Sequence, residues 1–497
     1  MHTNTLPYQF KSKPYQHQLE VFNISKDREY YALLFEMGAG KSKPTVDTAA
    51  YLYSCGRINA VLLVAPNGVH SKWLKEDFPL SMPDHIEYHG AVWEAGNKKA
   101  EKACEDLFKP GPHLRVLCMN VEAFSTKRGA EFAKSFLLAT DCMMVVDESS
   151  RIKNPSAKRT ETICKLGEKA KYRRILSGTA VTNSPFDLYG QFMFLEPQIL
   201  GQSYFAFKAE YAEMLPKDSP LVQGIMRKNN LRFAPQMEAK DETGKVKYKN
   251  LDKLKKLIEP HSMRVEKKDC LDLPDKIYQT RYYTLPPAHA KAYMQLRDKL
   301  KLDFGGGEKT TVMHKLTLLL RLQQLVSGYL PTDTGKLARL YPDPKENPRV
   351  KVLLDTLEDL EGSVIIWCRF VEDIEMLGKI FGDDAYLYYG NVSNADREEA
   401  KIGFQEGRRR FFIGNAQTGG IGLNLTAAKN VIYYGNTFSY EDRKQSEDRA
   451  HRIGQKFDVN YIDIVAEDTV DNIIIRSLRN KGDVADFMMD FEKELLK

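Results

Sequence analysis

The sequence predicts an α/β protein made of two parallel-sheet lobes in tandem, with helical insertions. Short apolar segments recur in two stretches of the chain, and helical patterns and glycines separate them, as is typical of buried parallel strands. The chain of 497 residues, 42% of them hydrophobic, also exceeds what one ordinary core accommodates. The expected strands are 31–35, 60–64, 115–119, 143–146 and 174–176 in the first stretch, and 364–367, 385–389, 410–413, 431–434 and 461–465 in the second.

The strand pattern is interrupted between about residues 195 and 350, where helical periodicity and charge increase. We therefore expect an N-terminal lobe over 1–270 with a helical insertion at about 195–262. A C-terminal lobe over 271–497 follows, with a helical insertion at about 285–345 and a closing helix. The polar stretch 240–256 is expected to form a hairpin or exposed loop followed by a helix.

Composition sets limits on location and partners. The net charge of +6, from 73 basic and 67 acidic residues, permits a polyanionic partner without requiring one. No apolar segment approaches the ~18 residues that span a bilayer, and the amino terminus lacks a signal-peptide core, so we expect a cytoplasmic protein without membrane contact. The seven cysteines lack metal-site spacing, which indicates reduced thiols.

A glycine-rich segment, EMGAGKS at 36–42, follows the first expected strand and opens a helical pattern. Gly38 and Gly40 allow a tight turn whose N–H groups face a phosphate. Lys41 would reach the β- and γ-phosphates of a nucleotide, and the Ser42 hydroxyl would bind Mg²⁺. The first glycine of a P-loop is absent here, so a purely structural turn is the alternative.

Two carboxylates, Asp147 and Glu148, end the apolar segment 143–146. Such a pair is costly at the end of a buried strand unless a cation or a water network uses it. Asp147 would hold Mg²⁺, and Glu148 would orient and deprotonate the attacking water. An acidic helix cap is the alternative interpretation.

The second stretch contains two further candidate segments. Arg449 and Arg452 would share one face if their segment is helical, and they could stabilise charge on a γ-phosphate; a solvated helix surface is the alternative. Three glycines in 418–424 bring backbone N–H groups close to an anion, either a nucleotide phosphate or a nucleic-acid phosphate. Gly420 and Gly422 are therefore candidate nucleotide-binding residues.

These segments, in this order, resemble helicase superfamily 2, and more narrowly the DNA-translocase ATPases of the SWI/SNF type in the compact form of bacteria and bacteriophages. The resemblance implies two RecA-like lobes. It rests on Tyr15-Gln16, EMGAGKS, LLVAPNGVHSKW (62–73), DESS (147–150) with RIKN (151–154), LSGTA (176–180), LPDK (273–276), 364–370, 419–424 and, above all, QSEDRAHRIGQ (445–455).

The resemblance also implies individual roles. It makes Arg449 and Arg452 the arginine fingers and Gln16 the residue that recognises adenine. The coupling residues would be Ser177, Gly178, Thr179 and Gln445, and the nucleic-acid contacts Ser71, Lys72, Thr418 and Asn424. Ser149 and Ser150 replace the family's Ala-His, from which we expect altered coupling and not lost hydrolysis.

The resemblance implies an ATP-dependent double-stranded DNA translocase that uses ATP and Mg²⁺ in a bacterial or phage-infected cell. The first alternative is a strand-separating helicase acting on DNA or RNA, which needs a wedge that the sequence does not identify. The second is a nucleotide-gated, nucleic-acid-binding scaffold with weak ATPase activity. Single-stranded DNA and RNA are therefore alternative partners, and the biological pathway, polarity and oligomeric state are not determined by the sequence.

Overall fold

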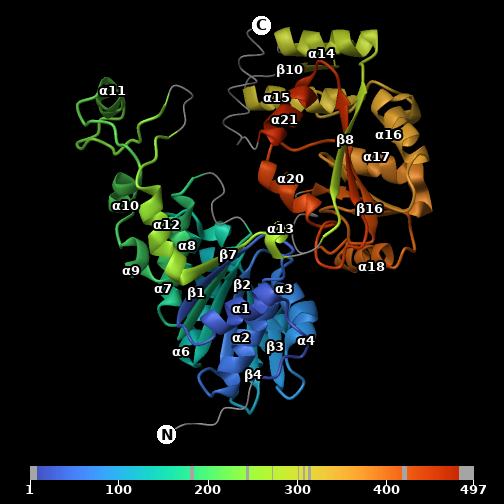
Figure 1. Ribbon diagram of the computed structural model, residues 1–497. Coiled ribbons are helices and arrows are strands. Elements are labelled where there is room, and N and C mark those ends of the chain that lie inside the picture. Colours follow the sequence, from blue (N-terminus) through green and yellow to red (C-terminus); the bar gives the residue numbers. More distant parts are fainter. Residues whose placement is uncertain are drawn as a thin grey trace. The chain divides into compact units, whose positions relative to one another are not determined.

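A computed structural model describes residues 8–178, 184–241, 246–270, 273–299, 301–305, 308–311, 315–416 and 423–480. The chain divides into two compact units, Met1–Leu271 and Asp272–Lys497, each described by itself below (Figure 1). Four predicted site residues, Thr179, Thr418, Gly420 and Gly422, lie outside the described residues.

Unit 1 contains a seven-stranded parallel sheet in the order β3-β4-β2-β5-β6-β1-β7. All five strands predicted for the first stretch are confirmed. The strands are β1 (Tyr30–Phe35), β2 (Ala60–Ala65), β3 (Tyr88–Val92), β4 (Leu114–Asn120), β5 (Cys142–Asp147), β6 (Tyr172–Leu176) and β7 (Ser262–Val265).

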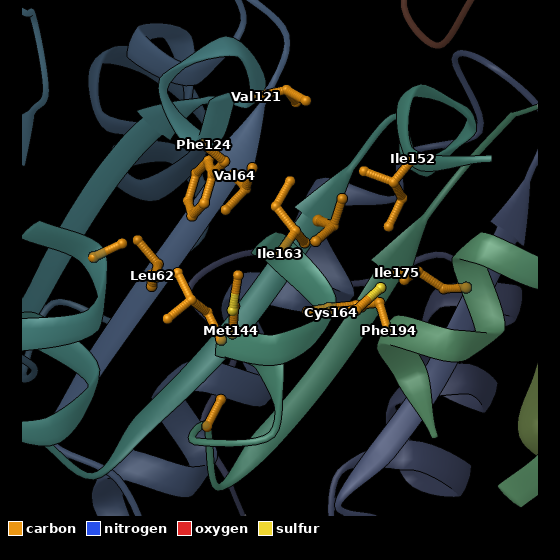
Figure 2. Close-up of a cluster of buried hydrophobic side chains, with 14 of the residues drawn as sticks. Leu62, Val64, Val121, Phe124, Met144, Ile152, Ile163, Cys164, Ile175 and Phe194 are labelled. Atoms are coloured by element: carbon orange, nitrogen blue, oxygen red, sulfur yellow. The ribbon is translucent and has the colours of Figure 1, made fainter. Parts of the chain in front are cut away.

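Helices cover both faces of this sheet, and their apolar sides complete the core. In Figure 2, Leu62, Met144 and Ile175 of neighbouring strands face Phe124 and Ile163 in a cluster of fully buried side chains. The helices of unit 1 are α1 (Gln16–Ser25), α2 (Ser42–Ser54), α3 (His70–Lys72), α4 (Phe78–Ser81), α5 (Lys98–Asp106), α6 (Lys127–Leu138), α7 (Lys158–Gly167), α8 (Asp187–Leu195), α9 (Pro197–Leu200), α10 (Tyr204–Tyr211), α11 (Pro220–Lys228), α12 (Leu251–Ile258) and α13 (Lys267–Cys270).

Unit 2 contains a six-stranded parallel sheet in the order β14-β15-β13-β16-β17-β8. The five strands predicted for the second stretch are confirmed. The elements are β8 (Lys276–Tyr283), α14 (Pro287–Lys299), α15 (Lys315–Val326), α16 (Pro348–Glu358), β13 (Ser363–Cys368), α17 (Val371–Phe381), β14 (Ala385–Tyr388), α18 (Asn394–Gln405), β15 (Phe411–Asn415), β16 (Ala428–Tyr433), α20 (Tyr440–Glu447), β17 (Val459–Ala466) and α21 (Val470–Arg479).

Three strands of the two large sheets escaped prediction, β3, β7 and β8, and all three lie at sheet edges. Edge strands are covered less completely, so their sequences lack the continuous apolar run of a central strand. The region expected to be helical before residue 345 also holds two antiparallel hairpins, β9–β10 (Lys301–Gly305 and Glu308–Thr311) and β11–β12 (Tyr329–Pro331 and Leu337–Arg339).

All seven cysteines are free thiols, and five of them are buried. Burial raises the pKa of Cys104 and of Cys142 to about 12, so both remain protonated and unreactive near neutral pH. Within the described ranges, no helix combines the length and the apolar character needed to cross a bilayer.

Unit 2 contains a cluster of buried polar side chains that come from β8, α16, α17, α21 and the residue that follows α15. The Arg349 guanidinium donates to the Asp471 carboxylate and, over 2.9 Å, to the Tyr283 hydroxyl. Ser327 Oγ donates to Asp373 Oδ2 over 3.3 Å. Burial raises the pKa of Asp373 to about 7, although the positive charge of Arg349 opposes this. The cluster therefore contains a carboxyl group that titrates near neutral pH.

We expect Asp373→Asn to flatten the pH dependence of stability. The folded-state pKa of Asp373 lies above its ordinary value of 3.8, so its contribution to stability is full below that value and is lost as pH rises through about 7. The unfolding free energy of the variant should rise relative to wild type by about 1.4 kcal/mol per pH unit within this window. Urea unfolding at several pH values tests this, and a pH-independent difference would contradict it.

Candidate active site

Four neighbouring strands of unit 1, β2, β5, β6 and β1, lead into the segments singled out from the sequence. Because these strands are parallel, their carboxyl ends meet at one edge of the sheet, the usual place for ligand binding in such folds. The glycine turn follows β1, the carboxylate pair ends β5, and the segment beginning at Ser177 follows β6.

The glycine turn has the geometry expected of a phosphate-binding loop. It connects the end of β1, Phe35, to the start of α2, Ser42. Gly38 and Gly40 have φ angles of 79° and 78°, in the left-handed region that favours glycine. Lys41 Nζ donates to the Phe35 carbonyl over 3.4 Å, so its charge lies over the loop.

Helix α1 holds this turn through two side chains that the sequence did not single out. His17 Nε2 donates to the Ala39 carbonyl over 2.8 Å, and Gln18 Nε2 donates to the Gly40 carbonyl over 3.0 Å. Both side chains are buried, whereas Gln16 is exposed at the first position of the helix. In the sequence, the only indication of a role for His17 and Gln18 was that they follow the predicted adenine-recognition residue Gln16.

Asp147 is buried at the end of β5 and accepts a hydrogen bond from Trp73 Nε1 over 2.9 Å. Burial and the charge of Glu148 raise the pKa of Asp147 to about 6, while the charge of Lys41 and the Trp73 hydrogen bond lower it. Lys41 and Asp147 are thus close enough to interact electrostatically. Trp73 was not predicted as a site residue, because its contact with Asp147 spans 74 positions of the chain.

Glu148 has a backbone φ of 49°, a left-handed conformation that is strained for a residue other than glycine. Its amide donates to Asp147 Oδ1 over 2.9 Å. The next residue, Ser149, is fully buried and its hydroxyl donates to Gln191 Oε1 over 2.7 Å. This bond ties the strained turn to α8.

The predicted coupling segment packs directly against the glycine turn. Ser177 is buried, and its amide donates to the Leu33 carbonyl over 3.2 Å. A Cβ atom on Gly178 would lie 2.6 Å from Met37 Cγ and 3.1 Å from the Met37 amide nitrogen. A side chain at this position would therefore force Met37 to move, so Gly178 and the glycine turn are in close contact.

The two predicted nucleic-acid contacts of unit 1 are only partly accessible to a ligand. Ser71 is half-buried, and the Lys72 side chain is 17% exposed. Lys72 Nζ lies 3.5 Å from an Asp77 carboxylate oxygen and 3.8 Å from one of Glu76. A phosphate bound by Lys72 would have to compete with these carboxylates.

In unit 2 the two candidate arginines do not lie on a helix. Helix α20 ends at Glu447, and the residues after it form turns. The two arginines therefore do not share the face of a helix, as a helical segment would have required. Their side chains nevertheless converge on one carbonyl: Leu423 O accepts from Arg452 Nη1 over 3.1 Å and from Arg449 Nη1 over 3.5 Å. Arg449 is 9% exposed, whereas Arg452 is half-buried.

Gln455 holds these turns in place, although the sequence assigned it no role. Its Nε2 lies 3.0–3.1 Å from the carbonyl oxygens of Thr426, Ala428 and Ala450, and its Oε1 accepts from the two backbone amides that follow it. One side chain thus connects the arginine-bearing turns to the start of β16.

The LPDK segment is attached to the same turns. Lys276 Nζ lies 3.1 Å from Glu447 and 3.5 Å from Asp448, and His451 Nε2 donates to the Pro274 carbonyl over 2.7 Å. The first residues of unit 2 are therefore fixed to the segment that carries the arginines.

Two other predicted residues lie nearby. Gln445 is half-buried and donates to the Glu441 carboxylate over 3.2 Å, within α20. Asn424 is exposed next to Leu423, and its contact with nucleic acid stays a prediction.

Comparison with known proteins gives matches over most of the chain. The model of the SNF2-related domain matches residues 15–328, and that of the helicase conserved C-terminal domain matches residues 348–454. An uncharacterized ATP-dependent helicase of Mycoplasma pneumoniae is 26% identical over 346 residues, and the chromodomain-helicase-DNA-binding protein 1-like of mouse is 24% identical over 470 residues. A solved SWI2/SNF2 ATPase core of Sulfolobus solfataricus in complex with double-stranded DNA aligns with 96% of this chain and 93% of that chain, at 23% identity and a TM-score of 0.41.

These matches cover 69% and 92% of the present chain for the Mycoplasma and mouse proteins, respectively. They cover only 30% and 47% of those relatives. The chain thus spans half or less of the length of these curated relatives.

Proposed function

This chain belongs to the SNF2-related domain family, and from that premise we propose that it is an ATP-dependent motor that translocates on double-stranded DNA, hydrolysing ATP between two RecA-like lobes. The observation that carries the proposal is that Lys41, in a phosphate-type glycine turn, interacts electrostatically with the buried Asp147 at the same sheet edge. The two groups come from strands that are separated only by β6.

The residues of unit 1 fit a nucleoside triphosphate with its metal. Backbone amides of the glycine turn and Lys41 would bind the β- and γ-phosphates of the substrate. Ser42 and Asp147 would hold Mg²⁺, which when bound supplies positive charge to the phosphates. The raised pKa of Asp147 supports this assignment, because burial disfavours its ionised form and a bound cation would stabilise that form.

Glu148 is the proposed general base. It would accept a proton from the attacking water through its carboxylate, which the strained backbone at this position orients. Arg452 and Arg449 of unit 2 would stabilise the charge that develops on the γ-phosphoryl oxygens. Ser177 and Gly178, packed under the turn, would transmit the change in nucleotide state.

Double-stranded DNA is the proposed track. The LPDK, RIKN and HRIGQ segments resemble the translocating subgroup, and the mouse relative is named as a DNA-binding helicase. Contacts to phosphates do not distinguish sequences, so binding should be sensitive to salt and largely independent of sequence.

The deciding experiment measures steady-state ATP hydrolysis without nucleic acid and with single-stranded DNA, double-stranded DNA or RNA. The proposal expects the strongest stimulation from duplex DNA, followed by displacement of a triplex-forming strand in a second assay. Stimulation mainly by single strands or RNA would favour the strand-separating alternative. No hydrolysis in any condition would leave the nucleotide-gated scaffold.

We expect Trp73→Phe to raise the Mg²⁺ concentration needed for half-maximal hydrolysis by about 10–100-fold, the usual cost of losing a group that orients a metal ligand. Phenylalanine retains the aromatic packing but cannot donate to Asp147. The matched control is Trp93→Phe, at another buried tryptophan of unit 1. Equal Mg²⁺ requirements in the two variants would contradict the role of Trp73.

A further inference from the structure

A projecting arm of unit 1, residues 212–241 and 246–250, is not used by the proposed catalytic site. Figure 1 shows α11 and its flanking loops extending beyond α10 and α12, away from the sheet of the same unit. We propose that its tip segment, Arg227–Phe233, is a second nucleic-acid contact that binds backbone phosphates and stacks an unpaired base. This inference rests on the proposed function, since it assumes that the motor acts on DNA.

The tip segment is exposed along its whole length. Phe233 is 77% exposed, an unusual position for a phenylalanine that serves only folding. Leu231 beside it is 42% exposed, and the Arg232 guanidinium lies 5.7 Å from the centre of the Phe233 ring. An exposed aromatic ring next to an arginine is the arrangement on which single-stranded bases stack.

The charge of this region favours a polyanion over a protein partner. Residues 219–237 contain three basic side chains and no acidic one. Within the described residues, none of Arg227, Lys228 and Arg232 forms an ion pair with a carboxylate. Asn229 and Asn230 add exposed amide groups between them. Uncompensated cations with interspersed amides match a phosphate backbone.

The base of the arm is connected to the residues that precede α8. Backbone hydrogen bonds join residues 212–215, 237–240 and 246–249 into an irregular stem. Tyr248 donates to Ser184 Oγ over 3.0 Å, and its ring lies 5.5 Å from that of Phe186. The arm is thus attached to residues of unit 1 that precede α8.

The test compares DNA binding by three variants of the full chain with wild type, in fluorescence anisotropy with blunt duplex and with forked DNA. The first removes the cations, Arg227→Ala with Lys228→Ala and Arg232→Ala. It should bind both DNAs about tenfold or more weakly, and the slope of log K against log salt should fall by about 2–3. The second, Phe233→Ala, should weaken binding to forked DNA about fivefold or more and leave blunt duplex unchanged.

The matched control removes three exposed lysines elsewhere in unit 1, Lys98→Ala with Lys99→Ala and Lys102→Ala on α5. Thermal unfolding verifies that each variant is folded. If the first variant binds DNA as the control does, the arm is not a nucleic-acid contact, and an acidic protein becomes the better partner. If Phe233→Ala does not distinguish the two DNAs, base stacking is wrong. If wild type binds no nucleic acid, the proposed function fails as well.

Discussion

Glu148→Gln is expected to slow ATP hydrolysis by about 10²–10⁴-fold while ATP remains bound. Glutamine has the shape of glutamate but cannot accept the proton of the attacking water. The turn itself should be preserved, because its contacts use the Glu148 backbone amide and the neighbouring Ser149 hydroxyl. Single-turnover hydrolysis, together with binding of a fluorescent ATP analogue, separates the chemical step from binding.

Lys41→Ala provides the contrast for this prediction. It removes the cation that lies over the glycine turn, so hydrolysis should be abolished together with tight ATP binding. A Glu148→Gln protein that hydrolyses ATP at nearly the wild-type rate would show that another group is the base. Equal loss of ATP binding in both variants would show that Glu148 acts in binding and not in catalysis.

Arg452→Ala is expected to reduce DNA-stimulated turnover by about 10³–10⁵-fold, the range typical of an arginine finger. Arg452 is the better candidate of the two arginines, because Arg449 is almost fully buried and its removal would also disturb packing. In the described structure Arg452 donates to the Leu423 carbonyl, a bond that it could exchange for a phosphoryl oxygen. Steady-state hydrolysis at saturating duplex DNA measures the effect.

Two controls make the Arg452 result specific. Arg452→Lys keeps the charge but loses the planar fork of donors, so its activity should lie between wild type and Arg452→Ala. Arg408→Ala removes an arginine of unit 2 that is paired with Glu399 and Glu406 at the surface, and should leave turnover near wild type. Nearly normal turnover in Arg452→Ala would refute its assignment as a finger.

The replacement of the family's Ala-His by Ser149-Ser150 introduces a buried polar contact. The buried Ser149 hydroxyl bonds to Gln191 of α8, so this position makes a polar contact that an alanine could not make. The catalytic turn is thereby fixed to a helix of the same unit. Altered coupling with retained hydrolysis stays a prediction for this replacement.

The α/β class, ten strands of the two large sheets and the order of the motifs were all predictable from the sequence. Central parallel strands are covered on both faces, so each must be apolar along its length, and this requirement is visible in a few consecutive residues. The glycine turn could also be predicted from the sequence, because a left-handed backbone at Gly38 and Gly40 is a local property of those residues.

Contacts between distant residues could not be predicted in this way. The hydrogen bond from Trp73 to Asp147, the convergence of Arg449 and Arg452 on Leu423 and the role of Gln455 depend on the path of the chain. The edge strands also needed the assembled sheet, since an edge position relaxes the requirement for apolar residues. Patterns over neighbouring residues encode burial and backbone conformation. Contacts between residues far apart in sequence exist only once packing has placed the elements that carry them.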